Sequence, residues 1–277
     1  VYKRQPWLDA VMLAISQLGG EILFMAIVIA LFWCMDKRKG YYLMTVGFFG
    51  IVANQFLKLV FRVSRPWIRD SEFTIVEGAR AGATGYSFPS GHTQNAAAVL
   101  GCPARMARKK GLKITLWVLY ALVGISRMYL GVHTPYDVGV GVVMGLVLVF
   151  GLYPFFSEKN YKPQRMYVLL GVMLALSIAF TTYTRLYPFP ADIEVDNLSH
   201  GIKNGYTLTG AVAGMLAAFW LDEHYVHFQT AGSLPAHIVK CVVGLGLLLG
   251  IKTVLKPPMN ALFGGDPIAD AFRYAIV

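Results

Sequence analysis

The sequence predicts an all-α protein that crosses a membrane several times, and its composition and apolar runs lead to this fold class. Of its 277 residues, 56% are hydrophobic and only 14% carry a charge, far fewer than in a soluble domain. The mean hydropathy is +0.53. Several apolar runs reach the roughly 20 residues that a helix needs to cross a bilayer. Because helices satisfy their own backbone hydrogen bonds in lipid, we expect a polytopic membrane helix bundle.

Apolar runs separated by polar loops place the expected helices along the chain. A short amphipathic stretch at 7–18 cannot cross a membrane alone and is expected to lie at its interface. The longer runs, which we expect to span or enter the bilayer, cover residues 21–34, 41–61, 90–106, 114–129, 135–156, 166–183, 206–221 and 234–255. The opening VYKRQ, residues 1–5, has no initiator Met and is expected to be a translated sequencing adapter outside the fold.

The basic residues indicate how the bundle is inserted. The net charge is +10, and much of the excess lies in the loops at 36–39, 105–113 and 159–165, which alternation places on one side. The positive-inside rule makes that side cytoplasmic, so the loops at 62–89 and 127–135 are expected together on the outer face. No basic, aromatic-rich soluble domain is visible, and we therefore predict no nucleic-acid partner.

A first polar cluster follows the run at 41–61. Asn54, Lys58, Arg62 and Arg65 recur at spacings of four, four and three, which is one side of a helix. Basic residues within a membrane are costly and normally face an interior cavity. Snorkelling to lipid headgroups is the alternative, and we favour it for Arg62. Lys58 and Arg65 are therefore expected to face the inside of the bundle.

A second cluster, Pro89-Ser90-Gly91-His92, lies at the start of an expected helix. Ser90 and Gly91 leave backbone N–H groups unobstructed, and these groups suit an anion together with the helix dipole. His92 would lie in the first turn beside that anion. Taken alone, Ser-Gly-His is more often a helix cap with an incidental histidine.

The third cluster comprises Ser126, Arg127, His133 and Asp137. His133 and Asp137 are four residues apart, so on a helix or turn they share a face. A carboxylate behind an imidazole fixes its tautomer and leaves the far nitrogen able to attack a substrate. The guanidinium of Arg127 suits phosphate. The alternative is that the histidine and aspartate merely cap or join two membrane helices.

Together the clusters predict a phosphate site, because the topology brings them to the outer ends of neighbouring helices. They supply three cations, a backbone anion nest, two histidines and one carboxylate. His133 must be neutral to attack, whereas His92 needs a proton for the leaving oxygen. These loops contain no carboxylate cluster of the kind that binds magnesium or calcium, and we predict neither a metal ion nor a cofactor. Cys34, Cys102 and Cys241 have no metal-ligand spacing.

In order and spacing, the three clusters resemble the three-part signature of the type 2 phosphatidic acid phosphatase superfamily. This superfamily includes lipid phosphate phosphatases, undecaprenyl-pyrophosphate phosphatases and vanadium haloperoxidases. The resemblance covers about 41–156 and implies a six-helix membrane phosphatase core with an outward-facing site. We expect this core over 6–183, and an outer loop with about two additional C-terminal transmembrane helices over 184–277.

The resemblance also implies a role for each site residue. His133 would form a phosphohistidine, Asp137 would orient it, and His92 would protonate the leaving group. The transferring phosphoryl group would be held by Lys58, Arg65, Ser90, Gly91 and Arg127. The implied protein is a metal-independent lipid phosphatase acting on a lipid phosphomonoester or an isoprenyl pyrophosphate, such as undecaprenyl pyrophosphate. We expect it in a bacterial plasma membrane, with its active site on the extracytoplasmic face.

Two other functions use the same residues. A membrane transporter that only binds an anion or a lipid would need Lys58 and Arg127 but would leave His92, His133 and Asp137 without a role. A vanadate-dependent peroxidase would share the three clusters, but the apolar spans argue against these soluble enzymes. The sequence leaves open the physiological lipid and the oligomeric state.

Overall fold

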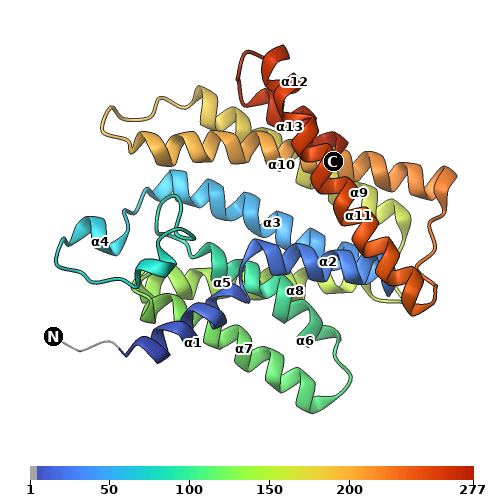
Figure 1. Cartoon of the computed structure of the whole chain (residues 1–277), viewed down its shortest axis with the longest axis horizontal. Helices are drawn as coiled ribbons and strands as arrows, with labels where there is room; N and C mark the ends of the chain where they lie inside the picture. The colour runs from blue at the N-terminus through green and yellow to red at the C-terminus, as the bar shows by residue number, and fades with distance from the viewer. Residues whose placement is uncertain (1–4) are drawn as a thin grey trace. The chain divides into compact units, whose positions relative to one another are not determined.

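The computed structural model describes residues 5–277, and within this range every regular element is a helix and no strand occurs (Figure 1). Residues 1–4 of the expected adapter lie outside the described range. Gln5, its last residue, precedes the first helix. The chain divides into two compact units, one combining Val1–Val28 with Tyr42–Pro154 and the other Ile29–Tyr41 with Phe155–Val277. The all-α fold class is therefore confirmed.

The α-helices of the N-terminal part of the chain are α1 (Pro6–Gln17), α2 (Glu21–Cys34), α3 (Lys37–Phe61), α4 (Pro66–Arg69), α5 (Gly91–Ala96), α6 (Cys102–Met106), α7 (Lys110–Tyr129) and α8 (Pro135–Phe156). Those of the C-terminal part are α9 (Pro163–Leu186), α10 (Val195–Leu221), α11 (Leu234–Val254), α12 (Lys256–Leu262) and α13 (Ile268–Ile276). A 3-10 turn, η1 (Glu77–Ala79), and two π-turns, η2 (Ala97–Gly101) and η3 (Asp222–Val226), complete the elements.

Several helices have the length and composition of membrane spans, as the apolar runs predict. Five segments qualify: Lys37–Arg69, Lys110–Tyr129, Pro135–Phe156, Pro163–Leu186 and Leu234–Leu262. Helices α1 and α2 meet at 43° and would make a sixth span if they cross together. The expected span over 206–221 does not qualify, and its helix, α10, begins earlier than expected, at Val195, in a polar stretch. The helix expected over 90–106 is present but divided into α5, η2 and α6.

The end of α3 differs from the single helical stripe that the first cluster predicts. The helix stops at Phe61, and Arg62 has a φ of 49°, in the left-handed region that commonly ends a helix. Asn54 and Lys58 therefore share a helix face, as expected. Arg65 lies in the loop between α3 and α4, and Pro66 begins α4 instead of ending α3. Lys58 and Arg65 are both buried.

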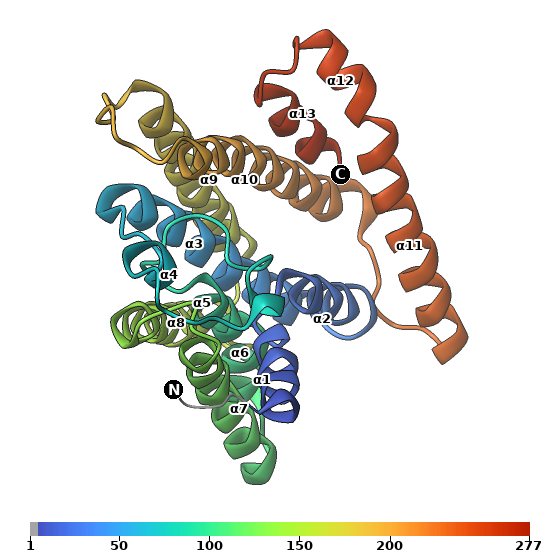
Figure 2. The same cartoon turned by 60° about the vertical axis from the view of Figure 1, so that its left-hand side comes forward.

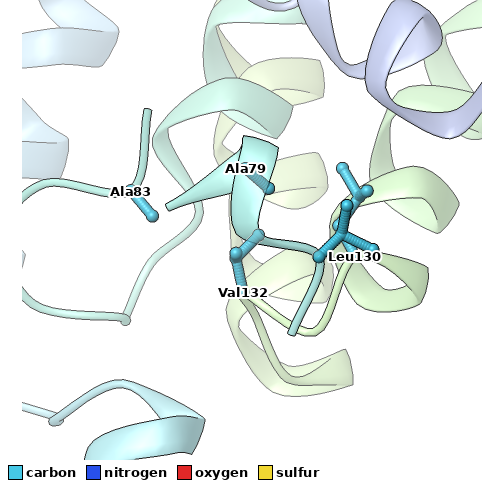
Figure 3. Packing of buried hydrophobic residues seen from close by; sticks show 5 residues of the cluster. Ala79, Ala83, Leu130 and Val132 are labelled. Atoms are coloured by element: carbon cyan, nitrogen blue, oxygen red, sulfur yellow. The ribbon is translucent and has the colours of Figure 1, made fainter. Parts of the chain in front are cut away.

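A small apolar core fixes the long loop at 62–89 against the turn that follows α7 (Figure 3). Its buried members are Val76, Ala79, Ala83, Leu130 and Val132, and partly buried residues of α1 pack against it. A backbone hydrogen bond of 3.1 Å from Val76 N to Leu130 O reinforces the contact. The loop of the first cluster and the turn of the third are thereby held together, as sequence analysis expected of the two outer loops.

Helix α1 packs along α7 in both views of the first unit (Figure 1 and Figure 2). The hydroxyl of Tyr129 donates to Asp9 Oδ1 at 2.9 Å, which ties the two helices. The amphipathic stretch at 7–18 is expected at the membrane interface, and in the structure this helix packs against α7.

In the second unit, α10 packs against both α9 and α13. The approach of α13 is close, because a Cβ at Gly210 would lie 2.0 Å from Ala271 O and one at Gly214 would lie 2.4 Å from Ala275 O. Glycine at these two positions therefore lets the backbones meet.

Candidate active site

Residues from all three sequence clusters line one cavity in the first unit, with a volume of about 110 Å³. Five of the eight predicted site residues line it: Lys58, Arg65, Gly91, His92 and His133. The other three, Ser90, Arg127 and Asp137, are buried and act on residues of the cavity wall. Residues up to 114 positions apart, from Gly19 to His133, thus contribute to a single polar site.

The hydrogen bond between Arg65 and His133 fixes which nitrogen of the imidazole carries the proton. Arg65 Nη1 lies 3.0 Å from His133 Nε2, and because a guanidinium can only donate, Nε2 is the acceptor. The ring proton is therefore on Nδ1, which lies 3.4 Å from Asp137 Oδ2. Burial lowers the pKa of His133 well below its usual range, and the charge of Arg65 acts in the same direction, against Asp137. These contacts favour a neutral imidazole whose Nε2 lone pair accepts from Arg65.

Asp137 also caps the start of helix α8, besides facing the imidazole of His133. Thr134 N donates to Asp137 Oδ2 at 2.7 Å, and Asp137 N donates to Thr134 Oγ1 at 3.3 Å. This reciprocal pair is a capping box at the start of α8. Ser87 Oγ donates a further bond of 2.6 Å to the same carboxylate oxygen. Asp137 therefore both caps α8 and contacts His133, although capping was expected as the alternative to an orienting role.

Arg65 joins the loop at 84–85 to the turn that carries His133. Its Nε donates to Gly85 O at 3.0 Å and its Nη2 to Thr84 O at 2.7 Å. Its Nη1 donates to Val132 O at 2.9 Å and also contacts His133 Nε2. The planar fork of donors thus positions the histidine as well as placing a positive charge at the cavity.

Lys58 reaches the cavity from α3, and its Nζ donates to the carbonyl of Tyr86. The side chain is 5% exposed, so its charge acts in a largely dry environment. Gly85 adopts a φ of +66°, a conformation that favours glycine, next to the Lys58 side chain.

The Pro89–His92 segment forms the start of α5, as predicted. The Ser90 side chain caps this helix by accepting from Thr93 N at 3.4 Å, and Ser90 N donates to Asp137 O at 2.9 Å. Asn54 Nδ2 donates to Pro89 O at 3.2 Å, which ties the segment to α3. Gly91, and not Ser90, is the part of the backbone nest that lines the cavity.

His92 lies in the first turn of α5, facing the cations. Burial lowers its pKa to about 3, and the charges of Arg127, Arg65 and Lys58 add to this effect in that order. Gly82 adjoins the ring, because a Cβ there would lie 3.6 Å from His92 Cε1. A pKa this low favours the neutral form of the His92 imidazole.

Sequence reasoning missed several residues of the site. Thr134 carried a usable signal, because threonine directly before a proline and three positions before an acidic residue is typical of a helix N-cap. Ser87 had none, since its partner lies 50 positions away. The cavity wall also includes the unassigned polar residues Glu21, Gln55, Thr84, Gln94 and Asn95.

Within residues 5–277, no group of three His, Cys, Asp or Glu side chains is arranged so that it could hold a metal ion.

Two family models match the chain. The PAP2 superfamily model matches residues 38–161, and the model described as PAP2 superfamily phosphatase, transmembrane extension, matches residues 206–277. The first covers the three clusters, and the second covers most of the C-terminal part.

Named relatives are membrane phosphatases of bacteria and eukaryotes. Phosphatidylglycerophosphatase B of Bacillus subtilis (strain 168) is 34% identical over 169 residues, which cover 56% of this chain and 78% of that protein. Undecaprenyl-diphosphatase BcrC of the same organism is 28% identical over 152 residues, covering 53% and 75%. Dihydrosphingosine 1-phosphate phosphatase C823.11 of Schizosaccharomyces pombe is 26% identical over 293 residues, covering 98% and 67%.

A solved structure is also similar. The crystal structure of a transmembrane PAP2-type phosphatidylglycerolphosphate phosphatase from Bacillus subtilis is 32% identical, with a TM-score of 0.48, over 57% of this chain and 80% of that chain.

Proposed function

The chain belongs to the PAP2 superfamily of membrane phosphatases, and from this premise we propose that it hydrolyses a lipid phosphomonoester or an isoprenyl pyrophosphate through a phosphohistidine at His133, without a metal ion. One observation carries the proposal: a neutral imidazole presents Nε2 at a cavity lined by Lys58 and Arg65 and points Nδ1 towards Asp137. A protein that only bound an anion would have no need for this arrangement.

In the first step, His133 Nε2 attacks phosphorus and the bond to the leaving oxygen breaks. The leaving oxygen takes a proton from His92, and Asp137 stabilises the positive charge that develops on the ring through its Nδ1 proton. In the second step, water attacks phosphorus and gives its proton to His92, while the phosphorus–Nε2 bond breaks and releases inorganic phosphate and neutral His133. Lys58 and Arg65 neutralise charge on the transferring oxygens, which is what phosphoryl transfer chiefly requires.

The contact between Arg65 and the nucleophile has a place in this sequence. Phosphoryl oxygens are stronger acceptors for a guanidinium than a neutral imidazole is. A substrate entering the cavity would therefore take the Arg65 Nη1 donor that His133 Nε2 now accepts. Substrate binding would then free the Nε2 lone pair of His133 from Arg65 in the same step.

Three features support the proposed location and domain division. Sequence parity, with the helical segment at 91–106 crossing the membrane, and the positive-inside rule together support an extracytoplasmic site. The two family matches support a core over 6–183 and a C-terminal part over 184–277. We propose a bacterial plasma membrane because two relatives are bacterial. An impermeant thiol reagent tests the site's side: in intact cells it should label Glu72→Cys but not Lys109→Cys.

The proposed function is tested by phosphate release from purified protein in detergent with EDTA present. The panel comprises phosphatidate, phosphatidylglycerophosphate, a sphingoid-base phosphate and undecaprenyl pyrophosphate. We expect release from at least one lipid, with no loss of rate from EDTA. Phosphate binding without any release would favour the anion-binding alternative, and inactivation by EDTA would contradict the metal-independent mechanism.

His92 is expected to take up a proton when phosphate binds. A dianion in the cavity offsets the three cations, so the pKa of His92 rises from about 3 towards its ordinary value. At pH 6, calorimetric titration with inorganic phosphate in buffers of different ionisation enthalpy should therefore show more proton uptake for the wild type than for His92→Gln. The difference in proton uptake between the two proteins should shrink as the pH rises above the pKa of His92 in the phosphate complex. Equal uptake by the two proteins would contradict the general-acid role.

Replacing Ser87 by alanine is expected to lower kcat by about 10-fold with little change in phosphate affinity, because Asp137 loses a 2.6 Å bond and orients His133 less well. The matched control is Ser177→Ala, since Ser177 is also buried and its hydroxyl donates to Leu174 O within its own helix. A Ser87→Ala enzyme as fast as this control would show that the bond has no part in catalysis.

A further inference from the structure

We infer that Ser16 of α1 is a positioning residue that holds the Arg127 guanidinium for phosphoryl binding. Arg127 Nη1 donates to Ser16 Oγ at 2.7 Å, across 111 positions of sequence. Both residues are buried, with Ser16 1% and Arg127 2% exposed. The inference rests on the proposed function, in which Arg127 helps to hold the phosphoryl group.

The remaining donors of Arg127 explain why it needs an anchor. Its Nε and Nη2 are buried and have no hydrogen-bond partner among the described residues. Leaving buried charged donors unpaired costs stability, so such groups are normally paired or serve a ligand. An anion in the neighbouring cavity would satisfy them, since Gly19, three residues after the Arg127 partner Ser16, lines that cavity, and the charge of Arg127 helps to lower the pKa of His92.

The chemistry of the anchor suits this purpose. Within the part of the chain that the structure describes, Arg127 forms no ion pair, and its hydrogen-bonding partner is a neutral hydroxyl. A carboxylate at this place would neutralise the guanidinium before substrate arrived. Serine fixes one nitrogen and leaves the full positive charge for the phosphoryl oxygens. A long arginine side chain also loses less freedom on binding when it is held beforehand.

Helix α1 is itself placed firmly enough to act as a support. Asp9 accepts from Tyr129 at the end of α7, two residues after Arg127. At the other end of α1, Asn95 Nδ2 donates to Gly19 O at 2.9 Å, and a Cβ at Gly19 would lie 2.4 Å from His92 O. Ser16 thus lies between two ties to the segments that carry Arg127 and His92. It also precedes residues 38–161, which match the PAP2 model.

The test is calorimetric titration of the full chain in detergent with inorganic phosphate. Ser16→Ala should weaken phosphate binding by about 10-fold, while Ser16→Thr, which keeps the hydroxyl, should stay near the wild type. Ser177→Ala, the buried serine on α9, should bind phosphate like the wild type. Thermal unfolding of each variant separates a change at the site from loss of the fold.

A double substitution distinguishes positioning from general packing of α1. Ser16→Ala should cause no further loss in an Arg127→Ala background, because Ser16 acts through the guanidinium. Additive losses would overturn the assignment, as would wild-type affinity in Ser16→Ala or equal weakening by alanine and threonine at unchanged thermal stability. Because binding is measured without turnover, a protein that binds phosphate but hydrolyses no lipid would refute the proposed function and still decide the role of Ser16.

Discussion

Replacing His133 by alanine is expected to abolish phosphate release, with a loss of at least about 10⁴-fold in kcat, because no other group can form the covalent intermediate. Phosphate affinity should change much less, since Lys58, Arg65 and the start of α5 remain in place. A large loss in kcat with retained binding is the result that separates a nucleophile from a binding residue.

The same variant allows the intermediate to be observed directly. Wild-type protein quenched during turnover of a ³²P-labelled substrate should carry a label that is stable in alkali and lost in acid, whereas His133→Ala should carry none. His200→Ala is the matched control, because His200 is an exposed histidine on α10 in the second unit. Normal labelling of the His133→Ala protein would disprove the assignment of the nucleophile.

Arg65→Lys is expected to lower kcat by about 10²–10³-fold although the charge is kept. The guanidinium donates to Gly85 O, Thr84 O and Val132 O and contacts His133 Nε2, and a single ammonium cannot reproduce this fork. The loss should therefore reflect a misplaced histidine and a poorly held phosphoryl group. Charge alone does not explain the role of this residue.

Arg69→Lys, at an exposed position on α4, serves as the control and should keep the wild-type rate. Steady-state kinetics on the lipid that the panel identifies, together with phosphate titration, measure both variants. If Arg65→Lys were fully active, positive charge alone would be sufficient at position 65, and the geometric role of the fork would be wrong.

Much of the fold could be predicted because hydropathy reports where helices run. The π-turn at 97–101 and the end of α3 could not, since they depend on local backbone geometry. Arginine is not a residue that favours a positive φ, so Arg62 gave no sign that the helix stops one residue before it. The amphipathic pattern of 7–18 predicted a position at the membrane interface, but a periodicity does not tell which helix packs against it.

The site was predictable in its charged and titratable members, because lysine, arginine and histidine stand out in an apolar chain. Four of the six charged or titratable residues, Lys58, Arg65, His92 and His133, line one cavity, as the topology led us to expect. Their hydroxyl partners were not predictable. Ser16 and Ser87 lie far along the sequence from Arg127 and Asp137, and small polar residues are common in membrane helices for many reasons.

The capping box at Thr134 and Asp137 makes one carboxylate responsible for both the beginning of a transmembrane helix and the alignment of an imidazole. Glutamate is an equally good partner in such a box, so helix initiation alone would tolerate either acid. The aspartate at position 137 has two further contacts that place its carboxylate, with Ser87 Oγ and His133 Nδ1. We therefore expect Asp137 to serve the proposed chemistry as well as the start of α8.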